Sequence, residues 1–387
     1  MTFIPHSEFL EHMLQRGFLN QYTDIQKLDS EFNNNIVVAY IGFDCTAPSL
    51  HVGSLIQIMK LRWLQKTGHK PIVLLGGGTT RIGDPSGKNE SRLLLDSNTI
   101  NKNMKSIRKI FEYFLRFDDS PCGALLINND IWLKSIDYLD FLREYGKHFS
   151  INRMLSFDSV KSRLEKKQTL SFLEFNYMIL QAYDFYYLNK NYACILQMGG
   201  SDQWGNIING VELVRRVLKK EVYGLTTPLI TLSSGVKMGK TEKGAVWLDK
   251  KLFSPYDYWQ FWRNTADEDV KKFLKFFTEV KISELSKEIN SQNDINKLKI
   301  FLANEATKIL HGEKTAKQSE NTAKETFQGT GISKNLPEIN ISQSELEKGI
   351  NILDLLSSNN IVSSKSDARR AIKGNGIKIN DKLVADE

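Results

Sequence analysis

The chain has 387 residues, of which 41% are hydrophobic and 25% charged, and its formal net charge is +7 at pH 7. This length supports two or three domains with a large apolar core, and the positive charge permits a nucleic-acid partner without requiring one. No apolar run could span a bilayer, the N-terminus lacks a signal peptide, and Cys45, Cys122 and Cys194 have no metal-ligand spacing, so we expect a cytoplasmic protein without membrane segment or zinc.

The first predicted elements are amphipathic helices over residues 7–17 and 24–32. A β-branched run over 36–39 then predicts a short buried strand. Apolar residues recur at helical spacing from Leu55 onward and stop at Gly68, which predicts a helix with a glycine C-cap. After its opening helices, the chain therefore enters a pattern of alternating strands and helices.

The segment 40–54 joins that strand to that helix, with Ser49 as a candidate N-cap. The free N–H groups at the start of the helix, together with its dipole, favour an anion. His51 in the first turn can add a hydrogen-bond donor, and Gly53 lets a ligand lie close against the backbone. The segment is either an anion-binding turn or an ordinary strand-to-helix turn of an α/β domain.

A second buried strand is predicted over 70–75, and the glycines at 76–78 follow it directly. A dinucleotide-binding fingerprint is excluded because Arg81 stands where a third glycine is required. The glycines instead indicate a tight turn over a ligand at the carboxyl edge of a parallel sheet. Asp84, in the loop that follows, either caps the next turn or holds a substrate ammonium group.

Strands and helices keep alternating, with helices predicted over 98–115 and 135–145 and strands over 125–129 and 195–198. This alternation predicts an α/β fold with a doubly wound parallel sheet. The strand 195–198 also runs into glycines and then into a helix that ends near Arg216. Two such helix starts in one sheet indicate a nucleotide bound at the switch point between its halves.

A helix that begins after Ser171 carries an unusual polar face. Ser171 and Glu174 form a capping box at its start. Tyr177, Gln181 and Asp184 are spaced by four and three residues and therefore share one face. A solvated face would usually carry Lys and Glu, so these side chains favour a binding face over the solvated alternative.

Residues 233–241 form a polar, glycine-containing loop that carries Lys237 and Lys240. A mobile loop with lysines can close on a polyphosphate. A solvated basic hairpin would have the same composition. The loop alone therefore does not decide between these interpretations.

The rest of the chain is predicted to be helical from Tyr256 onward, as a separate all-α unit. Residues 328–342 have the composition of a linker. A last small unit over 350–387 contains a basic helix over 364–373 that turns into a strand over 377–380. The clustered basic residues indicate binding to an RNA backbone, with a solvated helix as the alternative.

Considered together, five segments resemble the bacterial-type tyrosyl-tRNA synthetases and occur in the order of that family. These segments are 40–54, 83–88, 177–184, 199–203 and 237–241. Residues 51–54 resemble the His-Ile-Gly-His signature of class I synthetases. Residues 237–241 resemble the Lys-Met-Ser-Lys-Ser loop, with Gly239 and Thr241 as departures. The basic C-terminal unit resembles the S-four RNA-binding domain, named after a ribosomal protein.

The resemblance implies four groups of functional residues. The first would bind tyrosine: Tyr40 and Asp184 at its phenolic hydroxyl, Asp84, Tyr177 and Gln181 at its ammonium group, and Gln197 and Gln203 near the substrate and ribose. The second would bind ATP: Gly42, Asp44, His51, Gly53, Ser54, Gly200, Asp202 (on the ribose), Lys237 and Lys240. The third would act in catalysis at the phosphates: Thr46, His51, Arg92, Lys237, Lys240 and Thr241. The fourth would contact tRNA: Lys365, Arg369, Arg370 and Lys373.

The chain departs from the family pattern at a few positions. Ser54 replaces the second histidine of the signature, which puts its donor contact to the nucleotide in doubt, although a hydroxyl can also donate. Cys45 stands where the family often has proline, so the turn is expected to be less rigid. The C-terminal unit stops soon after Asn380, and we expect it to be incomplete.

The resemblance also implies a domain order, a reaction and partners. The expected domains are a Rossmann-like catalytic domain over 1–228 with a dimer-interface insertion at about 130–165, a linker with the lysine loop over 229–250, an all-α tRNA-binding domain over 251–326, a linker over 327–342, and the α+β RNA-binding domain over 343–387. The implied enzyme is a homodimeric tyrosine–tRNA ligase. It activates tyrosine with ATP, accompanied by Mg²⁺, and transfers it to the 3′-terminal adenosine of its tRNA.

Two alternatives remain. A tryptophanyl relative would recognise an indole N–H, which needs one acceptor, whereas a phenol both donates and accepts and suits Tyr40 with Asp184. A non-catalytic RNA-binding protein derived from a synthetase would have lost charged site residues. Asp84, Asp202 and Lys240 are all present, which favours the enzyme.

Overall fold

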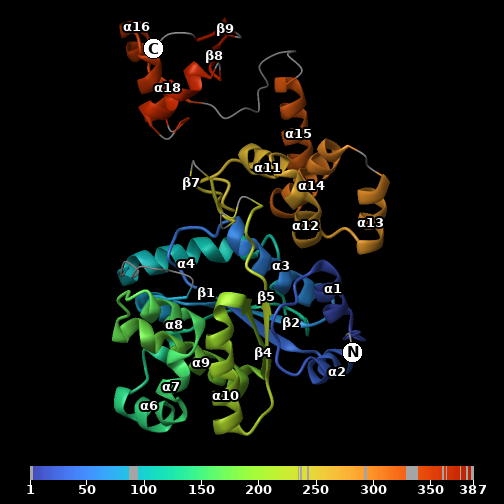
Figure 1. Ribbon diagram of the computed structural model, residues 1–387, viewed down its shortest axis with the longest axis vertical. Helices are drawn as coiled ribbons and strands as arrows, with labels where there is room; N and C mark the ends of the chain where they lie inside the picture. Colours follow the sequence, from blue (N-terminus) through green and yellow to red (C-terminus); the bar gives the residue numbers. More distant parts are fainter. Residues whose placement is uncertain are drawn as a thin grey trace.

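The computed structural model describes residues 3–86, 95–233, 235, 238–241, 244–291, 294–327, 339–359, 361–362, 364–374, 376–380 and 382–384. Among these residues, the central feature is a five-stranded sheet with the order β3-β2-β1-β4-β5 (Figure 1). Its strands are β1 (Val38–Phe43), β2 (Lys70–Leu75), β3 (Leu125–Asn128), β4 (Cys194–Gly200) and β5 (Tyr223–Thr227). All its pairings are parallel, which confirms the predicted α/β fold.

The strand order reverses between β1 and β4, because β2 and β3 follow on one side of β1 while β4 and β5 lie on the other. In a doubly wound sheet, ligands bind in the crevice outside the carboxyl ends of the strands at such a point. The strand predicted over 36–39 is instead Val38–Phe43, so Tyr40 lies within the sheet and not after it. Strand β5 was not predicted.

Both faces of the sheet are covered, and alternate residues of β1 divide between them. Ile41 and Phe43 join an apolar cluster with α3 (Val52–Lys66) and α4 (Ser97–Phe111). Tyr40 points the other way and packs on Phe185 of α9 (Phe172–Tyr192), with ring centroids 5.5 Å apart. Other helices around the sheet are α1 (Glu8–Arg16), α2 (Ile25–Asn34) and α10 (Trp204–Leu218).

The starts of these helices are set by side chains. The predicted capping box of α9 is confirmed, because the Ser171 hydroxyl accepts from the Glu174 N–H and the Glu174 carboxylate accepts from the Ser171 N–H. The predicted N-cap of α3 is wrong. His51 is the N-cap, whereas the Ser49 hydroxyl lies before the turn and donates to the Leu50 carbonyl oxygen at 2.8 Å.

Short helices fill the segment between β3 and α9. They are α5 (Asp130–Leu133), α6 (Tyr138–Glu144), α7 (Ile151–Leu155) and α8 (Asp158–Glu165). The single helix predicted over 135–145 is wrong in its start. Asp137 is the N-cap of α6, because its carboxylate accepts from the N–H groups of Leu139 and Asp140, and the helix therefore begins at the next residue.

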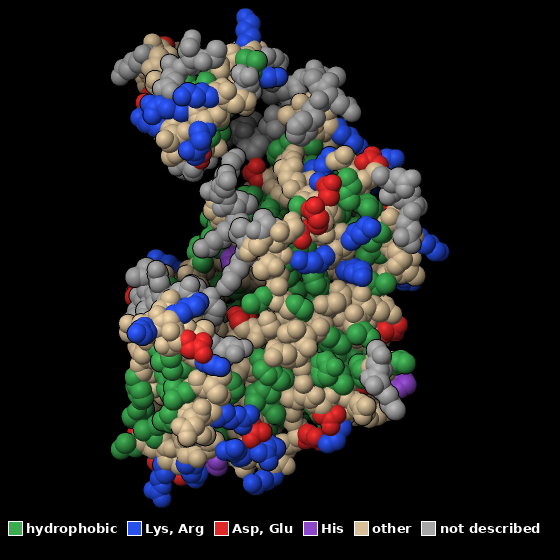
Figure 2. Space-filling view, viewed as in Figure 1, with side chains coloured by type: hydrophobic (Ala, Val, Ile, Leu, Met, Phe, Trp, Pro, Cys, Tyr) green, Lys and Arg blue, Asp and Glu red, His purple; other side chains and the backbone are tan. Residues whose placement is uncertain are grey.

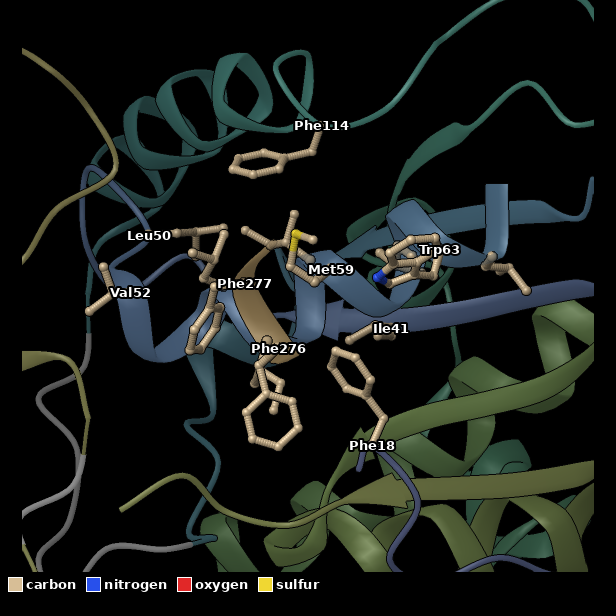
Figure 3. Packing of buried hydrophobic residues seen from close by; sticks show 14 of the residues in the cluster. Phe18, Ile41, Leu50, Val52, Met59, Trp63, Phe114, Phe276 and Phe277 are labelled. Atoms are coloured by element: carbon tan, nitrogen blue, oxygen red, sulfur yellow. The ribbon is translucent and has the colours of Figure 1, made fainter. Parts of the chain in front are cut away.

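Helices α11 (Pro255–Arg263), α12 (Asp267–Phe277), α13 (Ile282–Ser291), α14 (Ile295–His311) and α15 (Glu313–Phe327) form an all-α unit. Figure 3 shows how this unit meets the sheet domain. Phe276 and Phe277 of α12 belong to the same apolar cluster as Met59 of α3, and this cluster continues to Ile41 of β1. The all-α unit and the sheet domain thus share a continuous core.

The last part of the chain comprises α16 (Gln343–Lys348), α17 (Ile352–Ser358), α18 (Lys365–Lys373) and a small hairpin of β8 (Lys378–Ile379) and β9 (Lys382–Leu383). It has a small core of its own, in which Leu353 and Leu356 pack with Ala368 and Ile372. It lies beyond α15 in Figure 1. No helix within the described ranges is long and apolar enough to cross a membrane.

Candidate active site

A cavity of about 450 Å³ opens at the carboxyl ends of β1 and β4, where the strand order reverses. Elements far apart in the sequence form its walls, including the start of α3, the middle of α9 and the turn after β4. The predicted site residues that line it are Tyr40, Gly42, Asp44, Thr46, His51, Gly53, Ser54, Asp84, Tyr177, Gln181, Asp184, Gln197, Gly200, Asp202 and Gln203.

One end of the cavity is deeply buried and holds Tyr40 and Asp184, which are 1% and 2% exposed. The Asp184 carboxylate accepts hydrogen bonds from Asn129 Nδ2 at 2.9 Å and from Trp132 Nε1 at 2.8 Å. Burial raises the pKa of Asp184 to about 7, although both hydrogen bonds lower it. The Tyr40 hydroxyl has no hydrogen-bond partner among the described residues. This end therefore offers an unsatisfied hydroxyl beside a buried acceptor.

A second polar group lies around Asp84. One of its oxygens accepts from Gln203 Nε2 at 2.8 Å, and the other accepts from the backbone N–H of Ser86 at 2.9 Å. Asp84 thus both stabilises its own turn and faces the cavity, so the two interpretations of its role are compatible. Gln181 Nε2 donates to Gln203 Oε1 at 3.3 Å, which joins α9 to this group.

Asp44 lies at the carboxyl end of β1 and joins the same wall of the cavity. The Tyr177 hydroxyl donates to Asp44 Oδ2 at 3.2 Å, and the Thr79 hydroxyl donates to Asp44 Oδ1 at 3.1 Å. Tyr177, Gln181 and Asp184 all line the cavity, as their spacing along one helix face predicts. A ligand between these groups would meet carboxylate and amide oxygens, which suit an ammonium group.

The start of α3 provides the other end of the cavity. His51 Nδ1 accepts from the N–H of Gly53 at 3.0 Å, so the neutral ring carries its proton on Nε2. The loop over 233–241 lies close by, because the Gly239 carbonyl oxygen accepts from the N–H of Val246 at 3.2 Å, and the Val246 carbonyl oxygen accepts from the N–H of Val52 at 3.0 Å. Gly239, at φ +120°, lies so close that an added Cβ would be 2.6 Å from His51 Nδ1. Glycine is therefore required at this departure from the family loop.

Other predicted residues cannot be placed at the cavity. Arg92 and Lys237 lie outside the described residues. Lys240 and Thr241 form the short strand β6 (Lys240–Thr241), which pairs with β7 (Gly244–Ala245). Their side chains lie outside the described part of the structure. The predicted tRNA-binding residues lie on α18 in the C-terminal unit: Lys365, Arg369, Arg370 and Lys373. Lys365 pairs with Asp354 and Arg370 pairs with Asp367.

Several lining or supporting residues were not predicted. Asn129 and Trp132 hold Asp184, and Thr79 holds Asp44. Gln57, on the second turn of α3, also lines the cavity. Asn129 follows directly after β3, and polar residues at the carboxyl ends of parallel strands are expected at a ligand crevice. That signal could have identified Asn129. None marks Trp132, which belongs to a short helix.

The comparisons with known proteins agree with this geometry. Residues 33–328 match the family model of class I tRNA synthetases (W and Y). The chain is 58% identical to tyrosine–tRNA ligase of Pelagibacter ubique, over 98% of this chain and 93% of that protein. It is 53% identical to tyrosine–tRNA ligase of Roseobacter denitrificans, over 98% and 92%.

A solved structure gives the same result. A C-terminally truncated mitochondrial tyrosyl-tRNA synthetase of Aspergillus nidulans is 33% identical and superposes with a TM-score of 0.74, over 82% of this chain and 94% of that chain. A similar truncated enzyme of Coccidioides posadasii is 31% identical, with a TM-score of 0.70, over 81% and 91%. The fold, the cavity and these similarities agree, and the chain belongs to the bacterial-type tyrosyl-tRNA synthetases of class I.

Proposed function

We propose that this chain is a tyrosine–tRNA ligase that works in two steps. It first joins tyrosine to ATP, which forms tyrosyl-adenylate and releases pyrophosphate. It then transfers the tyrosyl group to the 3′-terminal adenosine of its tRNA. The observation that carries this proposal is the buried end of the cavity, where the Tyr40 hydroxyl, unpaired within the described part of the chain, lies at the same end as the Asp184 carboxylate.

A phenol satisfies both groups at this end. Its O–H would donate to the Asp184 carboxylate, and its oxygen would accept from the Tyr40 hydroxyl. An indole N–H could satisfy Asp184 but would leave the Tyr40 hydroxyl unpaired, which costs about 1–3 kcal/mol for a buried group. This difference favours tyrosine over the tryptophanyl alternative.

The ammonium group of tyrosine is proposed to lie against Asp84, Tyr177 and Gln181. The Asp84 carboxylate supplies the opposite charge, and the Gln181 side chain supplies a carbonyl acceptor. Gln203, which donates to Asp84 at 2.8 Å, holds this carboxylate in place. The tyrosine carboxylate would then point toward the start of α3, where the phosphates are expected. Gln197, whose Oε1 has no partner among the described residues, would face the substrate.

We propose that ATP lies between the start of α3 and the turn after β4. Asp202 would bind the ribose, with Gly200 allowing close approach. The N–H groups at the start of α3, His51 Nε2 and Thr46 would contact the phosphates, and Gly42, Asp44, Gly53 and Ser54 would line the rest of the ATP site. Arg92, Lys237 and Lys240 would add positive charge at the phosphates, and Thr241 would add a hydroxyl donor. Mg²⁺ would arrive with ATP as part of that substrate.

The first step needs no nucleophile from the protein. The tyrosine carboxylate is ionised at neutral pH and can attack the α-phosphate directly. Catalysis then consists of positioning the reactants and stabilising the charge that develops on the leaving pyrophosphate. Lysines on a loop that closes over the phosphates would contact the transition state more strongly than the ground state, which raises the rate.

The other parts of the chain are proposed to serve tRNA binding and assembly. The all-α unit over 251–326 and the basic helix α18 would bind the tRNA. The enzyme would work in the cytoplasm. The insertion at about 130–165 would form a homodimer interface. Its side chains support this, because Tyr138, Leu139 and Ile151 are 59%, 74% and 62% exposed. Hydrophobic side chains gather on the lower left of the molecule in Figure 2, where Figure 1 places α6, α7 and α8.

Tyrosine-dependent exchange of pyrophosphate into ATP tests the proposal. Exchange with tyrosine, but not with tryptophan or without an amino acid, is the expected result. Exchange with tryptophan would favour the tryptophanyl alternative, and no exchange would favour a non-catalytic RNA-binding protein. Charging of a tyrosine tRNA transcript then tests the second step, and light scattering at micromolar concentration tests the dimer.

A further inference from the structure

Lys60 is a buried lysine to which the mechanism above gives no role. It lies on the third turn of α3 and is fully buried. Its Nζ donates a hydrogen bond of 2.7 Å to the carbonyl oxygen of Gly199, at the carboxyl end of β4. Gly199 lines the cavity. A buried ammonium group is unfavourable unless it is hydrogen-bonded and faces an opposite charge, so its partners define what it does.

Burial lowers the pKa of Lys60 well below its ordinary value, and the carboxylate of Asp202, three residues after Gly199, partly opposes this by favouring the ammonium form. The same Gly199 carbonyl oxygen also accepts from the Thr227 hydroxyl at 3.1 Å. Gln57, one turn before Lys60 on the same face of α3, donates to that hydroxyl at 3.3 Å. Side chains of α3 and β5 therefore fix the start of the turn from Gly199 to Asp202, through the carbonyl oxygen of Gly199.

We propose that Lys60 is a positioning residue for the nucleotide. It fixes the turn after β4 against α3. Asp202, which binds the ribose, is thereby held at a fixed position relative to His51, which contacts the phosphates. Both ends of this arrangement are attached to one rigid helix, and loss of Lys60 lets the ribose contact shift relative to the phosphate contacts. The inference rests on the proposed function, because that function assigns the ribose to Asp202.

Tyrosine recognition should depend much less on Lys60. Gln203, in the same turn, is held by its own hydrogen bonds, which do not involve Lys60. It donates to Asp84 at 2.8 Å and accepts from Asn206 Nδ2 at 3.1 Å. A general loss of packing would weaken the use of both ATP and tyrosine, whereas a loss of positioning should weaken the use of ATP alone. Comparing the effect on ATP with the effect on tyrosine therefore distinguishes these two explanations.

The test compares Lys60→Met with Lys66→Met in pyrophosphate exchange. Lys66 lies on the same helix but is 46% exposed and pairs with Glu279 at 3.0 Å, so it is a matched control. Lys60→Met should lower kcat/KM for ATP by about 10- to 100-fold, the range for one lost hydrogen bond to a charged group. The Kd for tyrosine, measured by equilibrium dialysis, should stay within about threefold of wild type. Lys66→Met should match wild type in both.

Two results would overturn the proposal: equal losses for ATP and tyrosine, or kinetics equal to those of Lys66→Met, whether or not the melting temperature falls. Absence of exchange in the wild-type protein would instead refute the proposed function. If circular dichroism shows that Lys60→Met does not fold, Lys60→Gln serves in its place. The amide keeps an N–H donor without the charge, and the same selective loss for ATP is expected at a smaller size.

Discussion

The indole N–H of Trp132 donates a hydrogen bond of 2.8 Å to Oδ1 of Asp184, which joins α5 to the middle of α9. Asn129 donates to the other carboxylate oxygen at 2.9 Å. Hydrogen bonds to the charged form favour ionisation and oppose the effect of burial on the Asp184 pKa. The proposed acceptor for the phenol is thus held in place, and kept partly ionised, by residues that do not belong to its own helix.

Trp132→Phe should therefore weaken tyrosine binding without disrupting the local packing. The phenyl ring can still stack on Tyr187, whose ring centroid lies 4.2 Å from that of Trp132. Only the donor to Asp184 is lost, and we expect KM for tyrosine to rise about tenfold, with KM for ATP unchanged. Exchange kinetics measure both constants. A variant with wild-type KM for tyrosine would show that this hydrogen bond does not matter for recognition.

Tyrosine affinity should fall as the pH drops through about 7. The pKa of Asp184 is raised to about 7, mainly by burial, and only the ionised carboxylate is a pure acceptor for the phenol proton. Binding therefore favours the ionised form, and the Kd should rise about tenfold per pH unit well below that value. Titration calorimetry between about pH 5.5 and 8.5 measures this slope, which Asp184→Asn should abolish.

Folding stability should respond to the same group in the opposite direction. A folded-state pKa of about 7, above the ordinary value of 3.8, means that Asp184 contributes stability below pH 3.8 that is lost as the pH rises through about 7. Asp184→Asn should remove this part of the pH dependence of the melting temperature. A pH profile identical to that of wild type would contradict the raised pKa.

Tyr40→Phe and Asp184→Ala should both reduce the preference for tyrosine over phenylalanine. With phenylalanine bound, each group would be buried and unpaired, which costs about 1–3 kcal/mol for each. Tyr40→Phe removes one neutral partner and should have the smaller effect, whereas Asp184→Ala removes the charged acceptor. The ratio of specificity constants in pyrophosphate exchange measures the effect. If neither variant narrows this ratio, the phenol binds elsewhere.

Gly239→Ser restores the residue of the family loop, yet we expect it to lower the rate of adenylate formation. Its Cβ would lie 2.6 Å from His51 Nδ1, on a backbone at φ +120° that side chains rarely adopt. The loop would have to move away from the start of α3, while tyrosine affinity stays unchanged. Gly235→Ser is the control, because Gly235 also has a positive φ, +80°, but no atom of the described residues lies within 4 Å of an added Cβ.

The sequence predicts those parts of the site that follow from local spacing. Tyr177, Gln181 and Asp184 could be placed on one face because helical periodicity decides it. The cap at His51 was missed because both Ser49 and His51 precede α3, and only the path of the chain decides which reaches the first N–H groups. The contact of Trp132 with Asp184 joins segments far apart in the sequence, and no local pattern encodes it.

The continuous core between the sheet and the all-α unit has a consequence for dissection of the chain. Phe276 and Phe277 of α12 pack in the same cluster as Met59 of α3, so removal of the helices after 250 would expose the inner side of α3 to water. We expect a fragment ending there to aggregate. A fragment ending near 340 should instead keep amino-acid activation, because Leu353, Leu356 and Ile372 form a core of their own. Evolution could therefore exchange or shorten the terminal unit without loss of amino-acid activation, while the activation and helical parts must be inherited together.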